Sequence, residues 1–135
     1  MTKQIAVVDV SSFTTDAKFR AWGLPCSTAL QACDLVMTAD TGQINWSTVT
    51  KPVATNTKAG YEIYRFDDTL QSTKPIYLRV DYGSGGVASG NGPSTWITVG
   101  TGSNGSGTIT GPLLGPIQSG YTSTATPANT AMLCH

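Results

Sequence analysis

The stretch Thr95-Trp96-Ile97-Thr98-Val99-Gly100-Thr101-Gly102-Ser103-Asn104-Gly105-Ser106-Gly107-Thr108-Ile109-Thr110-Gly111 decides the fold of this chain. Two short segments rich in threonine and isoleucine flank a loop of glycine, serine and asparagine. β-Branched residues favour strands, and glycine and asparagine favour turns. No Cys, His, Lys, Glu or Asp lies between Tyr82 and Ser119, so this region predicts a sheet without ionisable chemistry.

The segments that precede this stretch extend the strand pattern. Pro75 to Tyr82 alternates, with Ile76, Leu78, Val80 and Tyr82 predicted on one face and Tyr77, Arg79 and Asp81 on the other. Further strands are expected at Tyr61–Phe66, Trp96–Val99 and Thr108–Thr110. Short strands joined by glycine-rich loops indicate an antiparallel meander.

One helical region is expected near the N-terminus. Thr14 or Thr15 can cap it, and Asp16 would stand in the first turn, where the helix dipole favours an acid. Gly23-Leu24-Pro25 is expected to break or kink this helix. A second helical piece is expected from about Ser27 to Leu35. Cys26 and Cys33 are seven residues apart, so on one helix they would share a face.

These patterns predict a mainly β protein, built as an antiparallel meander or sandwich, with a jelly-roll-like arrangement also open and a short N-terminal helical segment. Three parts are expected along the chain. They are a strand or arm at 1–12, which contains the apolar run Ile5–Val10, a β domain at 13–111, and an extended segment at 112–135 that is rich in glycine, proline, serine and threonine.

Composition narrows the classes of function. The chain has 135 residues, of which only 12% are charged, and its net charge is zero. No cluster of lysine or arginine is present, so a nucleic-acid partner is not expected. Ile5–Val10 is too short to cross a bilayer, so membrane insertion is not expected. Without a secretory signal pattern, we expect synthesis in a cytosol.

The residue types that carry chemistry are scattered. Cys26, Cys33 and Cys134 are expected to be free buried thiols, and with His135 they lack the spacing of a zinc site. His135 is the only histidine and the last residue, a poor place for a catalytic base. We therefore predict no catalytic residues, no metal and no cofactor.

Two further interpretations use other side chains. A small hydrolase would use Asp67, Asp68 or Asp81, although a solvated turn explains the first two more simply. A binding module would contact a glycan through Trp96, Tyr82 and Asn104, because aromatic faces stack on sugars. Trp96 is the best surface candidate among the tryptophans, although large aromatic residues more often belong to a core.

Four segments, taken in order, resemble a group of uncharacterised virion structural proteins of tailed bacteriophages. They are the helical region Phe19–Leu35, then Asp40–Trp46, Ala59–Asp68 and Trp96–Gly102. The resemblance covers about residues 15 to 111 and implies no catalytic residues. It implies a virion location after synthesis in the bacterial cytoplasm, with other virion proteins as partners.

The resulting hypothesis is a phage structural protein that assembles as a homo-oligomer, in a ring or trimer, with a preference for the tail, tail tip or baseplate. Exposed extended segments can add to a neighbour's sheet, so Ile5, Val7 and Leu133 are the candidate interface residues. The alternatives are a capsid cement or decoration protein, and a module on the particle exterior that binds a host-surface glycan.

Overall fold

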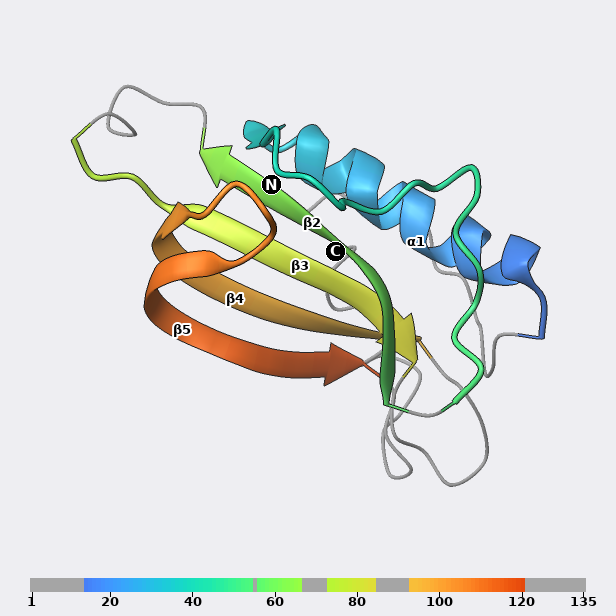
Figure 1. The fold of residues 1–135 in the computed structure, drawn as a ribbon. Coiled ribbons are helices and arrows are strands. Elements are labelled where there is room, and N and C mark those ends of the chain that lie inside the picture. Colours follow the sequence, from blue (N-terminus) through green and yellow to red (C-terminus); the bar gives the residue numbers. More distant parts are fainter. Residues whose placement is uncertain (1–13, 55, 67–72, 85–92, 121–135) are drawn as a thin grey trace.

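The computed structural model describes residues 14–54, 56–66, 73–84 and 93–120, which form one helix and one sheet. In chain order the elements are α1 (Asp16–Gln31), β1 (Leu35–Met37), β2 (Thr57–Phe66), β3 (Tyr77–Ser84), β4 (Pro93–Ser103) and β5 (Ile109–Gly120). The strands pair in the order β1-β2-β3-β4-β5, each antiparallel to the next, and α1 lies on one side of the sheet (Figure 1). The protein is mainly β and is an antiparallel meander, as predicted. In this part of the chain there is one sheet and no second layer of strands.

The alternation predicted for β3 is confirmed. Val80 and Tyr82 are buried in the core that β3 shares with α1. Asp81 is paired with Tyr61 of β2 and Trp96 of β4, and these side chains lie on the face opposite α1. Each face of the sheet therefore carries its own set of buried residues.

Helix α1 starts as predicted but does not break. Thr15 is the N-cap, and its hydroxyl accepts a hydrogen bond from the backbone N–H of Lys18 at 3.1 Å. The helix then continues through Pro25 as a single element. Proline in a helix interior costs roughly 3 kcal/mol. Burial of one helix face on both sides of Pro25 offsets that cost, and the residues of this face are Phe19, Trp22, Cys26 and Ala29.

The second helical piece was expected to reach Leu35, and this C-terminal boundary is wrong. The helix stops at Gln31, and Leu35 is already the first residue of β1. Between them Asp34 has a positive φ of 60°, a conformation that ends helical structure. Cys33 therefore lies outside the helix and does not share a helical face with Cys26.

The connection between β1 and β2 covers the outer edge of β2. The backbone N–H groups of Thr38 and Ile44 donate to the carbonyls of Ile63 and Tyr61, each at 2.8 Å. Ile44 and Trp46 are partly buried and both pack against the core. The ring centroid of Trp46 lies 4.9 Å from that of Tyr82 in an edge-on arrangement.

The hairpin of β4 and β5 is longer than expected. The two strands pair from Ser103 opposite Ile109 to Ser94 opposite Gly120, with register shifts on both sides of Val99. The boundary expected after residue 111 therefore falls inside β5. Strand β3 ends at Ser84 and β4 begins at Pro93, and residues 85–92 between them lie outside the described residues.

Candidate functional site

A buried carboxylate joins α1 to the sheet. Glu62 of β2 is 1% exposed. Its Oε1 accepts hydrogen bonds from the hydroxyls of Tyr64 at 2.8 Å and Tyr82 at 2.7 Å. Its Oε2 accepts from the Ser27 hydroxyl of α1 at 2.7 Å and from the indole Nε1–H of Trp46 at 3.4 Å. Four donors thus satisfy one carboxylate in the core.

The cluster around Glu62 is closed to solvent and its phenols are fixed as hydrogen-bond donors. Burial raises the pKa of Tyr64 and Tyr82 above the ordinary value for tyrosine, and the nearby charge of Glu62 raises it further. Both phenols therefore keep their protons and remain donors. Because Glu62 is almost completely buried, a substrate cannot reach it in this conformation.

A second charged cluster lies on the opposite face of the sheet. Arg79 and Asp81, two residues apart on β3, form a two-pronged ion pair, with the Nη2···Oδ1 distance at 2.8 Å and the Nε···Oδ2 distance at 3.1 Å. Lys58 approaches Asp81 at 3.7 Å, and its Nζ lies 5.5 Å from the ring centroid of Trp96. Arg79 also donates to the backbone carbonyl of Gly107 in the β4–β5 turn. This ion pair therefore holds the turn against the sheet.

Asp40 also holds the turn between β4 and β5. Its carboxylate accepts hydrogen bonds from the Ser103 hydroxyl, from the backbone N–H of Gly107 at 3.1 Å and from the Thr38 hydroxyl at 2.6 Å. Burial works against the ionised form, but these bonds, together with the backbone of Gly105, hold the pKa of Asp40 below its ordinary value. The connection after β1 is thereby fastened to the turn between β4 and β5.

The structure does not bring the three predicted glycan contacts together. Trp96 is 8% exposed and lies on the face opposite α1, whereas Tyr82 is 0% exposed and faces α1. Both rings are buried, as the preferred interpretation of the large aromatic residues as core expects, so Trp96 does not offer its ring at the surface. Asn104 is exposed, but its side-chain carbonyl accepts from the backbone N–H groups of Ser106 and Thr108 and so shapes the turn.

Several predicted residues lie outside the described ranges. They are the interface candidates Ile5, Val7 and Leu133, the hydrolase candidates Asp67 and Asp68, and also Cys134 and His135. The remaining hydrolase candidate, Asp81, is buried in its ion pair with Arg79. Through Arg79, which also donates to the Gly107 carbonyl, Asp81 helps to hold the β4–β5 turn against the sheet.

The cysteines differ from expectation. Cys33 is an exposed free thiol, because the helix ends before it. Cys26 is buried in the core, as expected, but it is disulfide-bonded rather than free. Among the described residues, no group of three or more His, Cys, Asp or Glu is placed to hold a metal ion.

The most accessible candidate for a functional surface is β5. It is an edge strand of twelve residues that lies at the margin of the sheet away from α1 (Figure 1). Its sequence contains no charged residue. Three large apolar side chains are at least half exposed, namely Leu113 at 61%, Leu114 at 51% and Ile117 at 50%. An apolar strand edge of this kind is typical of a surface that meets another protein.

The sequence pattern predicted only the first residues of β5, within Thr108–Thr110, because the pairs Gly111-Pro112 and Gly115-Pro116 interrupt the strand pattern. Leu113 and Leu114 between the two pairs, and Ile117 after the second, were the sequence signal that could have indicated a longer strand. Glu62 was missed too, although it is the only glutamate of the chain and lies in the middle of an apolar strand. A lone acid in that position signals a buried polar partner.

In the part of the chain that the structure describes, no helix is long and apolar enough to cross a membrane. Comparison of the chain with protein-family models, with curated proteins and with solved structures found no match.

Proposed function

We propose that this protein is a structural component of a tailed-bacteriophage virion and that it assembles through oligomeric interfaces, with the tail, tail tip or baseplate as its preferred place. Two features support the proposal. The order of four sequence segments resembles virion structural proteins, and the fold presents a long apolar strand edge. In this proposal the protein is not an enzyme, and its buried clusters around Glu62 and Asp81 serve stability.

The exposed edge of β5 is the observation that carries the proposal. Full burial of a leucine or isoleucine side chain stabilises by about 1.5–3 kcal/mol, so covering the exposed halves of Leu113, Leu114 and Ile117 is worth about 3 kcal/mol per copy. Association itself costs roughly 4–15 kcal/mol. A single contact through β5 is therefore weak, and a closed ring, in which every copy makes such contacts at once, is favoured.

The two prolines of β5 define how a partner can bind. Pro112 and Pro116 have no backbone N–H, so continuous pairing of another strand along this edge is interrupted. The partner contacts the apolar side chains and only parts of the backbone edge. Prolines on an edge also limit unregulated aggregation, which suits a protein that must stay soluble before assembly.

Particle composition tests the proposed function. Particles purified from cells infected with a phage that encodes this chain should contain it in fixed stoichiometry, and a reconstruction should place it in the tail rather than on the capsid. Placement on the capsid surface would support the cement alternative instead. If the protein stays in the soluble host fraction as a particle-free monomer, the virion proposal fails.

A further inference from the structure

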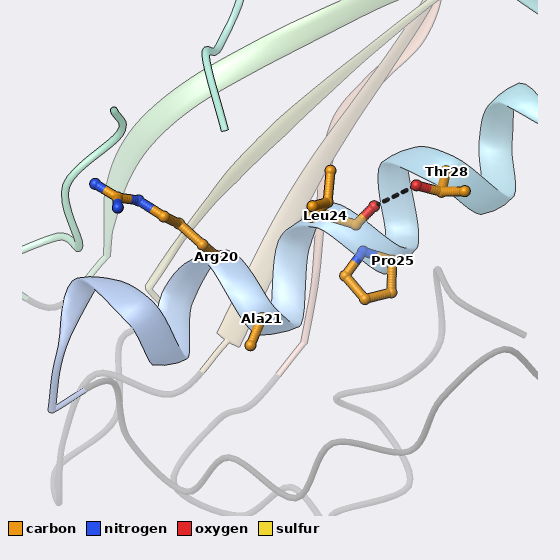
Figure 2. A pocket seen from close by; sticks show the side chains of 5 residues that line it. All are labelled: Arg20, Ala21, Leu24, Pro25 and Thr28. Atoms are coloured by element: carbon orange, nitrogen blue, oxygen red, sulfur yellow. Dashed lines mark hydrogen bonds between the residues drawn. The ribbon is translucent and has the colours of Figure 1, made fainter. Parts of the chain in front are cut away.

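An apolar groove runs along the outer face of α1 (Figure 2). It has a volume of about 460 Å³ and is lined by Arg20, Ala21, Leu24, Pro25 and Thr28. These residues belong to a stripe of the helix distinct from the buried one, which contains Phe19 and Trp22. The Leu24 side chain is 48% exposed.

The outer stripe of α1 is more apolar than the solvent face of a surface helix usually is. The solvent face of such a helix is normally polar. Here it presents alanine, leucine and proline, and the Thr28 hydroxyl turns back to the Leu24 carbonyl at 3.0 Å (Figure 2). Pro25 has no N–H to donate to the carbonyl of Ala21 four residues earlier, so the helix lacks one backbone hydrogen bond on this side. An apolar occupant explains both features.

We propose that the N-terminal run Ile5–Val10 of the same chain packs in this groove, with Asp9 facing Arg20. The inference goes beyond the proposed function and does not depend on it. The run is β-branched and apolar, and it precedes the helix by only a few residues. A short tether keeps the loop-closure cost small and gives this segment a high effective concentration at the groove.

The lengths of the two segments match. If residues 13–15 reverse the chain, an extended arm advances about 3.3 Å per residue along α1, whose own rise is about 1.5 Å per residue. Val8 then lies about 13 Å from the reversal, and Leu24 lies about 12 Å from the start of the helix. The apolar run therefore comes level with the apolar part of the groove.

Charge supports the same direction of packing. Asp9 is the one charged residue in Ile5–Val10. In this alignment it comes within side-chain reach of Arg20, which lies at the end of the groove nearer the start of α1. The Nε–H of Arg20 donates to the carbonyl of Val49 at 2.8 Å, which fixes the position of this side chain. The arm thus brings an acid to a positioned base.

Amide hydrogen exchange of the full chain tests the proposal. The backbone amides of Ile5–Val10 should exchange at least about tenfold more slowly than in an unstructured peptide. Leu24→Glu places a charge in the groove and should abolish this protection. Val53→Glu is the matched control, because Val53 is 84% exposed and does not line the groove, and it should leave the protection unchanged.

A charge exchange provides a second test that does not change the groove's apolar lining. Asp9→Lys should reduce the protection, and the double variant Asp9→Lys, Arg20→Glu should restore most of it. Unprotected Ile5–Val10 amides in the unmodified protein would overturn the proposal. So would protection that is lost on dilution, which would assign the arm to a second copy, or Leu24-dependent protection confined to residues 131–134, which would assign the C-terminal segment.

Discussion

At the scale of single residues, Gly23 shows how packing outweighs helix propensity. A Cβ added at Gly23 would overlap the indole ring of Trp46, which lies against α1 at this point. In an exposed helix interior, Gly→Ala stabilises by about 1 kcal/mol. Here we expect Gly23→Ala to destabilise the protein by about 1–2 kcal/mol, because the free-energy cost of overpacking is larger than the gain from the higher helix propensity of alanine. Thermal unfolding of the variant would measure the loss.

A second background separates the clash from other effects. In a Trp46→Leu protein the ring that the new methyl group strikes is gone, so Gly23→Ala should be neutral or stabilising there. A melting temperature that rises on Gly23→Ala in the unmodified protein would contradict the packing explanation.

Glu62 gives a second prediction at this scale. Glu62→Gln keeps the shape but replaces one accepting oxygen by an NH₂ group, so donors that now face that oxygen lose their acceptor. Each buried donor left unsatisfied costs about 1–3 kcal/mol, and we expect a total loss of about 2–3 kcal/mol. Urea denaturation would measure it. Lys18→Gln removes a charge from an exposed position of α1 and should leave the midpoint nearly unchanged.

At the scale of elements, Asp40 links the connection after β1 to the turn between β4 and β5. Its folded-state pKa lies below the ordinary value of 3.8, which approximates the unfolded chain. The stability that ionised Asp40 supplies is therefore fully present above that value and is lost as pH falls through the lower folded pKa.

Asp40→Asn tests this linkage. We expect the melting temperature of the variant to lie below that of the unmodified protein by a constant amount between about pH 5 and 7, and the gap to narrow below about pH 4. Melting curves recorded across this range would show it. A gap that widened towards acid pH would mean that Asp40 does not hold the turn through its ionised form.

At the scale of the whole molecule, β5 is expected to control self-association. Leu114→Lys places a charge on the exposed edge, and we expect it to weaken association about tenfold or more, since a buried lysine would need a partner. Sedimentation velocity over a range of concentrations would measure this. Val53→Lys adds the same charge at another exposed apolar position and should leave association unchanged. Equal weakening by both variants would point to net charge rather than to β5.

Much of the fold could be predicted from local sequence patterns. The candidate site in β5 could be predicted only in part. The alternation in β3, the cap at Thr15 and the strand at Tyr61–Phe66 were predictable because backbone preference and side-chain periodicity act between neighbours in sequence. Strand β5 was not predicted to its full length, because its pairing with β4 overrides the Gly-Pro pairs that locally disfavour a strand.

By itself, the sequence determined a mainly β meander that is preceded by a capped helix. Only the tertiary structure decided that α1 continues through Pro25, that Trp96 is buried beside Asp81, and that Glu62 is satisfied by groups from α1, the sheet and the connection after β1. The physical reason is that local preferences are set by adjacent residues. Burial and hydrogen-bond satisfaction are set by distant partners, such as Trp46 and Ser27, which lie 16 and 35 positions from Glu62 and meet it only when the chain is folded.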